Sequence, residues 1–329
     1  MIWLRCRLGL EIGTGHAARC FTLTKALEKQ GVEVGLVLDE DAGGFIRRVE
    51  EEGLHHVVIR PGIPLVKEAA RYPDGNIVLD LSNPTIQSGL SDLVAALKAD
   101  GRKVALIEGL DHEAYPGPAS PDLVITPYLG AEARRDHHGT NWIGGGAYAV
   151  LGGEYSAPPS DLEARSSILM MMSGSDPWHL TEEVLAVSQP FGEKLVVVIG
   201  GSIPPDRARK ISKMAEDLGA RIEHAPPTLQ PLFMQSRAAL IGPGLVKYEA
   251  VATRTPAVII SPGDQFVATQ SAFIDAGLAE VLNSGRPDFA EALSGAIARA
   301  LTTVPRWPAI IDGQGAGRAA QVISKYLGE

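Results

Sequence analysis

The sequence contains few cysteines, an excess of acidic over basic residues, and no long apolar run. Cys6 and Cys20 are too few for a disulfide framework and lack metal-ligand spacing, so we expect both to be small buried core residues. The net charge of −9 argues against general nucleic-acid binding, although binding one nucleotide needs only a few local donors. No stretch reaches the ~18 apolar residues of a membrane span, and the N-terminus lacks a signal-peptide pattern. We therefore expect a cytoplasmic protein without membrane insertion.

The 329 residues, 45% of them hydrophobic, are enough for two globular domains. Short Val/Ile/Leu runs alternate with helical segments, which is typical of parallel sheets covered on both faces. The runs are 34–38, 57–59, 76–79, 104–107 and 123–125, then 168–172, 195–199, 238–241 and 258–260. Glycine and proline gather between the two sets. The pattern predicts an α/β fold with two doubly wound Rossmann-like domains, 1–155 and 156–329, facing a central cleft.

A strand, a glycine loop and a helix follow one another near the N-terminus. Gly13 and Gly15 precede the helix, and His16 lies in its first turn, where it could reach an anion held by the backbone N–H groups. A dinucleotide fingerprint would need a third glycine where Ala18 stands, and Asp39 is the only acidic candidate for a ribose. The pattern also lacks the Gly-Lys-Ser/Thr of a P-loop. A tight turn with a surface histidine is the competing interpretation.

A second glycine cluster follows the run 238–241. Gly242 and Gly244 allow a ligand to approach the backbone closely, whereas Pro243 has no N–H to donate. Glu249 lies about one turn into the next helix and could accept hydrogen bonds from ribose hydroxyls. The alternative is an ordinary strand–helix turn with a solvated glutamate. In either case the cluster lies at the carboxyl end of a predicted strand, where open sheets bind ligands.

Residues 242–250, with Pro256, Asp264 and Gln265, resemble the nucleotide-binding signature of GT-B glycosyltransferases. The resemblance is closer to the nucleotide-sugar hydrolases of pseudaminic acid biosynthesis and their spore-coat polysaccharide relatives. Three further motifs resemble that family in the same order along the chain: 12–19, 146–151 and 174–181. The resemblance implies a GT-B fold, a UDP-sugar substrate, a nucleotide-binding C-terminal domain, and no metal or other cofactor.

The resemblance also implies a mechanism, in which His16 is the general base that takes a proton from water attacking the anomeric carbon. UDP would leave, with its charge stabilised by backbone N–H groups of the loop that starts at Gly242. Residue chemistry and the resemblance together give the expected substrate contacts: Gly13, Gly15, Arg19, Asp80, Gly174, Ser175, Gly242, Gly244, Leu245, Val246, Glu249, Asp264 and Gln265.

The chain departs from the family pattern at four places. Arg7 stands where an aspartate is expected, Lys247 near an expected threonine or serine, and Asp264 in place of an asparagine. Glu108 and Gly109 stand where paired aspartates are usual. The departures leave a non-catalytic nucleotide-sugar-binding partner subunit as one alternative to a UDP-sugar hydrolase. An inverting GT-B glycosyltransferase is another, because water and a sugar hydroxyl are similar nucleophiles. The identity of the sugar and the oligomeric state stay open.

Overall fold

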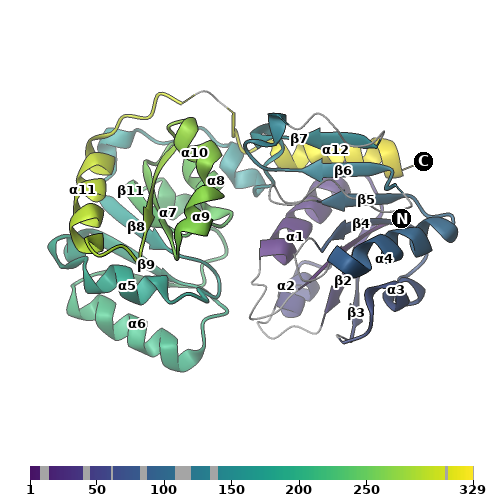
Figure 1. Cartoon of the computed structure of the whole chain (residues 1–329), viewed down its shortest axis with the longest axis horizontal. Helices are drawn as coiled ribbons and strands as arrows, with labels where there is room; N and C mark the ends of the chain where they lie inside the picture. The colour runs from purple at the N-terminus through teal and green to yellow at the C-terminus, as the bar shows by residue number, and fades with distance from the viewer. Residues whose placement is uncertain are drawn as a thin grey trace. The chain divides into compact units, whose positions relative to one another are not determined.

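A computed structural model describes residues 1–7, 15–39, 45–60, 62–81, 87–107, 120–133, 140–307 and 310–328. The chain forms two compact units, Met1–Gly152 with Gln314–Glu329, and Gly153–Gly313 (Figure 1). Each unit is built on its own parallel β-sheet. Among the described helices, none combines the length and the apolar character needed to cross a bilayer.

The first unit contains a seven-stranded sheet, within the described ranges, in the order β3-β2-β1-β4-β5-β6-β7. All of its strand pairs are parallel. Its strands are β1 (Ile2–Cys6), β2 (Val34–Asp39), β3 (His56–Ile59), β4 (Asn76–Asp80), β5 (Val104–Ile107), β6 (Leu123–Thr126) and β7 (Asn141–Gly144). Its helices are α1 (Gly15–Glu28), α2 (Phe45–Glu51), α3 (Leu65–Glu68), α4 (Gln87–Ala99) and α12 (Gly315–Leu327).

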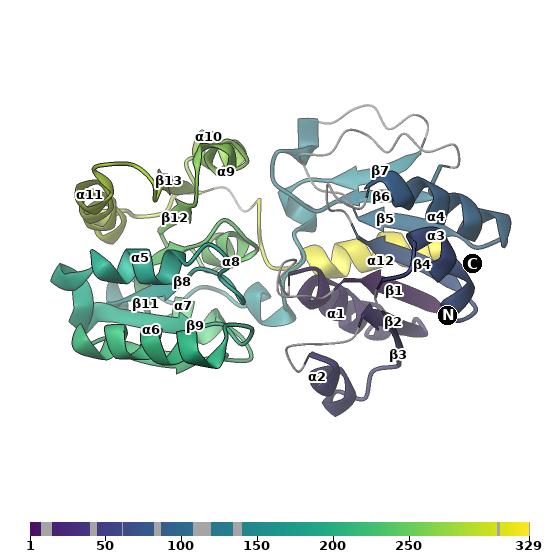
Figure 2. The same cartoon turned by 60° about the horizontal axis from the view of Figure 1, so that its bottom comes forward.

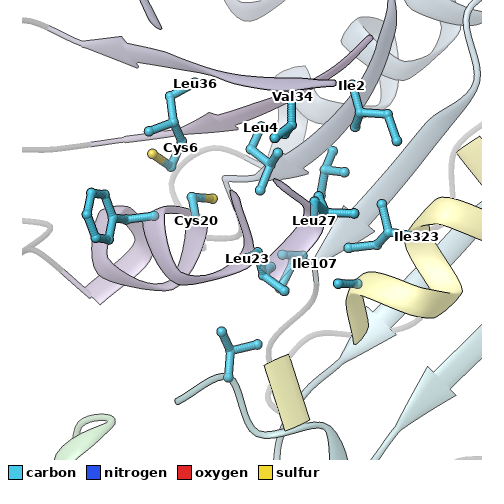
Figure 3. Packing of buried hydrophobic residues seen from close by; sticks show 14 of the residues in the cluster. Ile2, Leu4, Cys6, Cys20, Leu23, Leu27, Val34, Leu36, Ile107 and Ile323 are labelled. Atoms are coloured by element: carbon cyan, nitrogen blue, oxygen red, sulfur yellow. The ribbon is translucent and has the colours of Figure 1, made fainter. Parts of the chain in front are cut away.

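Successive residues of β1 enter different cores, because side chains alternate between the two faces of a strand. Leu4 and Cys6 pack with α1 residues such as Leu23 on one face (Figure 3). Trp3 packs on the other face with residues of α3 and α4. Both faces are therefore covered, as a parallel sheet requires. Cys6 and Cys20 are buried free thiols in the first of these cores, as expected.

The second unit repeats the topology with six described strands in the order β10-β9-β8-β11-β12-β13. Its strands are β8 (Ser167–Met171), β9 (Leu195–Ile199), β10 (Arg221–His224), β11 (Ser236–Ile241), β12 (Ala257–Ser261) and β13 (Ala279–Asn283). Its helices are α5 (Leu180–Ala186), α6 (Pro205–Asp217), α7 (Gln230–Phe233), α8 (Val246–Ala252), α9 (Asp264–Ala268), α10 (Ser271–Asp275) and α11 (Phe289–Thr302). The predicted pair of doubly wound α/β domains is confirmed.

The last helix lies with the first unit, whereas the sequence assigns it to the second domain. One face of α12, which carries Ala319, Ala320 and Ile323, is buried in the core that also contains α1. Figure 2 shows α12, in yellow, beside α1. The helix ends the chain after the second unit has been completed, so its position along the sequence does not reveal the sheet that it covers.

Candidate functional site

Each sheet reverses its strand order once, between β1 and β4 in the first unit and between β8 and β11 in the second. Open α/β sheets bind ligands beyond the carboxyl ends of the strands at such a switch point. The predicted residues gather at these two places. Asp80 ends β4, and the Gly242 loop follows β11.

His16 and Asp80 form the centre of the cluster in the first unit. Nδ1 of His16 lies 2.6 Å from Oδ1 of Asp80, across 64 positions of sequence. The Asp80 side chain has no exposed surface, whereas 22% of the His16 side chain is exposed. The carboxylate is thus fixed inside the unit, and the imidazole reaches the surface.

Arg19 anchors the same carboxylate through two hydrogen bonds. Its Nε donates to Oδ2 of Asp80 at 2.6 Å and its Nη2 to Oδ1 at 2.5 Å. Nη1 donates to the hydroxyl of Tyr128, a contact that the sequence analysis does not predict. Burial alone would raise the pKa of Asp80, but Arg19 and His16 outweigh it and hold that pKa well below its usual range. Asp80 is therefore ionised at neutral pH.

The ionised Asp80 determines the tautomer of His16. A carboxylate only accepts hydrogen bonds, so Nδ1 must carry the proton that lies between the two side chains. Nη2 of Arg19 is also 3.2 Å from Nδ1, but both atoms then carry protons and this contact is a close approach only. In the neutral imidazole, Nε2 then holds the lone pair and can accept a proton. An orienting carboxylate of this kind also stabilises the imidazolium that forms.

A second ionic cluster lies beside β1 and includes Arg7, one of the departures noted in the sequence. Arg5 is fully buried and donates to Asp39 at 2.7 Å and to Glu68 at 3.0 Å. Arg7 reaches the other oxygen of Glu68 at 3.5 Å. Tyr72 donates to Glu68 at 2.9 Å. Asp39, the candidate for a dinucleotide ribose, is thus engaged with a buried arginine.

In the second unit, the two glycines of the 242–244 loop have different roles. A Cβ on Gly242 would lie 1.9 Å from the carbonyl oxygen of Met172, so packing requires glycine there. The N–H of Gly242 donates to Met171 at 3.1 Å, so it is not available to a ligand, contrary to the expectation for this loop. A Cβ on Gly244 would meet no atom within 4 Å. The fold has no need of glycine at 244, and a ligand could use that space.

The predicted segment 174–181 is a helix cap. Asp176 accepts hydrogen bonds from the N–H groups of Leu180 and Thr181, both at 3.0 Å, at the start of α5. Arg207 donates to the same carboxylate at 2.6 Å. Ser175 is nearly buried beside it. A Cβ added to Gly200 would lie only 2.3 Å from the carbonyl oxygen of Gly174, so the backbone of this segment packs closely against Gly200. This motif therefore has a structural role that its sequence did not reveal.

A pocket of about 240 Å³ opens between the β8 and β11 loops and the segment of α9 and α10. Its lining is mainly apolar and includes Trp178 and Phe266, whose rings meet edge-on at 4.9 Å. Gly244 lines it, whereas Asp264 and Gln265 do not. Sequence reasoning missed Phe266 and Gln270, which follow the predicted pair by one and five positions.

Glu249 is half-buried on α8, yet its Oε2 is buried and lacks a hydrogen-bond partner among the described residues. Burial raises the pKa of this carboxyl to about 7, against a smaller lowering by the Tyr155 hydroxyl. The Tyr155 hydroxyl is likewise buried and without a partner in the described part of the chain. The predicted contact with a ligand hydroxyl therefore falls to the partly exposed remainder of the Glu249 side chain, because Oε2 itself is buried.

The other described departures have partners within the protein. Lys247 is nearly buried and donates to Gln270, and burial lowers its pKa to about 8. Asp264 is exposed at the start of α9 and accepts a hydrogen bond from Asn283 at 2.7 Å.

The remaining predicted contact residues lie at the starts of helices. Leu245 and Val246 form the start of α8. Gly15 begins α1 with open space around it.

Two predicted features lie outside the described residues, namely Gly13 and the pair 108–109. Within the described ranges, no three His, Cys, Asp or Glu side chains are grouped as a metal site requires.

Three known proteins resemble the chain over nearly its whole length. The spore coat polysaccharide biosynthesis protein SpsG of Bacillus subtilis is 24% identical over 96% of this chain and 95% of its own. MurG of Acinetobacter baumannii is 12% identical with a TM-score of 0.64, covering 98% of this chain and 99% of its own. The UDP-GlcNAc 2-epimerase of Methanocaldococcus jannaschii, solved with UDP-GlcNAc and UDP, is also 12% identical with a TM-score of 0.64, covering 98% of this chain and 99% of its own. No protein-family model matches the chain.

The fold is GT-B-like. This assignment follows because the chain forms two Rossmann-like units with corresponding strand orders, and these solved structures match it over nearly its whole length. The fold expected from the resemblance is confirmed. A GT-B-like fold supports several reactions, so the reaction has to be argued from the His16 and Glu249 clusters.

Proposed function

We propose that the chain binds a UDP-sugar and hydrolyses the bond between the sugar and the diphosphate. The observation that carries the proposal is the Nδ1 contact of His16 with buried Asp80, which leaves Nε2 able to accept a proton. In the proposed step a water molecule gives a proton to Nε2 while its oxygen bonds to the anomeric carbon. The bond from that carbon to the phosphate oxygen breaks, and UDP departs with the electron pair.

Asp80 and Arg19 act as positioning residues in this proposal, because both are buried and engaged with each other. Asp80 holds the imidazole in one tautomer and offsets the charge of the imidazolium. The nucleotide is assigned to the second unit. There Gly244 leaves open space, and Glu249 retains exposed surface through which its carboxyl group can reach the ribose. An epimerase of similar fold was solved with UDP-GlcNAc and UDP, which supports a UDP-sugar as the ligand.

The first experiment measures UDP release from a panel of UDP-sugars by the wild-type chain and by His16→Ala. Loss of a general base typically lowers the rate by about 10²–10⁴-fold. His55→Ala is the matched control, because His55 is exposed in the same unit and should retain full turnover. Full UDP release by His16→Ala would refute the role of His16.

Product analysis separates the remaining reaction classes. Free sugar formed with UDP supports hydrolysis, whereas UDP release that requires an added sugar acceptor supports a glycosyltransferase. A changed sugar that stays attached to UDP would indicate an epimerase, as in the solved relative. Tight UDP-sugar binding without turnover would favour the non-catalytic subunit.

The nucleotide site is tested separately by thermal shift with UDP. Gly244→Ala should leave stability unchanged and weaken the shift, because the added methyl enters space that the protein itself does not fill. Gly317→Ala, at another glycine with nothing within 4 Å, is the control. An unchanged UDP shift in Gly244→Ala would remove this loop from the proposed site.

A further inference from the structure

Two neighbouring polar groups of the second unit are buried and lack a hydrogen-bond partner among the described residues. They are the Tyr155 hydroxyl in the 3₁₀ turn Gly153–Ser156 and Oε2 of Glu249 on α8. The turn packs against α8. One group is a donor and the other an acceptor, so a small movement of the two side chains would let the Tyr155 hydroxyl donate to the Glu249 carboxylate. A buried polar group without a hydrogen-bond partner destabilises the fold, which favours that pairing.

We propose that Tyr155 is a positioning residue for Glu249, whose hydroxyl holds the carboxylate as the acceptor for ligand hydroxyls and sets the pH range of nucleoside binding. This inference rests on the proposed function, in which Glu249 contacts the ribose. Tyr155 is 4% exposed, so it acts through Glu249 and does not itself touch the ligand. Glu249 retains exposed surface although Oε2 has none, so the rest of the carboxyl group can face the ligand.

Few other charged groups act on Glu249. Glu154, beside Tyr155, raises the pKa of Glu249, as burial does. The elements α7 and β12, which pack against α8, carry no titratable side chain. Arg237, the one charge of β11, donates to the carbonyl of Thr303 at 2.9 Å. Thr228 lies near the phenol but gives its own proton to Glu154 at 2.8 Å. Tyr155 is therefore the neighbour that favours the ionised form of Glu249.

The pH dependence follows from a pKa of about 7 for Glu249, which burial raises. An ionised carboxylate accepts from both ribose hydroxyls, whereas a protonated one must give up an acceptor position. UDP affinity should therefore rise about tenfold between pH 6 and pH 8. Tyr155→Phe removes the interaction that lowers the pKa, so the midpoint should move to higher pH.

The experiment measures UDP dissociation constants from pH 6 to pH 9 for wild type, Tyr155→Phe and Glu249→Gln. Titration of the UDP phosphate is common to all three and cancels in the comparison. Tyr155→Phe should bind several-fold more weakly at pH 7, and the deficit should shrink toward pH 9. Glu249→Gln should lack the rise that the wild type shows. A Tyr155→Phe deficit of equal size at every pH, or no deficit, would overturn the inference.

A ligand-free measurement separates this inference from the proposed function. The Glu249 carboxyl is titrated by carbon-13 NMR in the wild type and in Tyr155→Phe, and Glu249→Gln identifies its signal. The same midpoint in both proteins refutes the role of Tyr155, whatever UDP does. A second outcome is that the midpoint shifts in Tyr155→Phe while Glu249→Gln binds UDP as tightly as the wild type. That outcome upholds the coupling of the two side chains but refutes both the ribose contact and the pH control of binding.

Discussion

Replacement of Asp80 by asparagine tests the buried cluster that orients His16. The substitution keeps the shape of the side chain but leaves the Arg19 guanidinium, which is 3% exposed, without its counter-charge. Breaking a buried ion pair from one side costs about 3–5 kcal/mol. For a unit of this size, each kcal/mol changes the midpoint of thermal unfolding by about 2–4 °C. The transition of the first unit should therefore fall by roughly 6–20 °C.

Scanning calorimetry measures this change. Asp206→Asn is the control, since Asp206 forms an exposed pair with Arg209 that should contribute little. The double variant Asp80→Leu with Arg19→Met removes both charges and should recover much of the lost stability. A loss below about 1 kcal/mol in Asp80→Asn, or no recovery in the double variant, would refute the reasoning.

Acidification tests the same pair. The pKa of Asp80 lies below its unfolded value of about 3.9. The ionised form therefore contributes stability above about pH 4, and this contribution is lost as the pH falls toward the folded pKa. In Asp80→Asn that part of the acid sensitivity should be absent. Equal acid sensitivity in both proteins would contradict the assignment.

Three further substitutions probe the frame around the candidate site. Arg5→Met should cost about 3–5 kcal/mol by urea unfolding, because it strands two buried carboxylates; a loss under 1 kcal/mol would contradict this. Gly242→Ala should destabilise the second unit strongly in calorimetry, since its Cβ would overlap the Met172 carbonyl, whereas Gly244→Ala should not; equal melting curves would show that the loop can shift. Asp176→Ala should cost about 2–4 kcal/mol, because two cap bonds and an arginine partner are lost; unchanged circular-dichroism melting would exclude the cap as a stabilising element.

Sequence analysis identified the strands that carry a continuous apolar run. Runs such as 195–199 are continuous apolar segments, and the structure buries every residue of that strand. The edge strands β7 and β13 were missed because they are only partly buried and carry no such run, whereas the edge strand β3 was found from its apolar run 57–59. An edge strand has less need of a continuous apolar run, so periodicity alone does not reveal it.

The candidate site was predictable where it follows strand ends and glycine loops. His16, Asp80, Gly244 and Glu249 were identified from those positions. The role of Asp176 as a helix cap and the contact of Tyr128 with Arg19 were not, because they depend on side-chain directions. Local sequence determines which residue types stand at a strand end, but not what they touch.

The amino-acid sequence by itself determined the parallel α/β class and the two Rossmann-like halves, because burying both faces of a sheet imposes a local apolar pattern. Only the tertiary structure decided that Asp80 meets His16 and that α12 joins the first unit. Both depend on strand order and on which apolar faces meet. Those are contacts between segments far apart in sequence, and no local pattern encodes them.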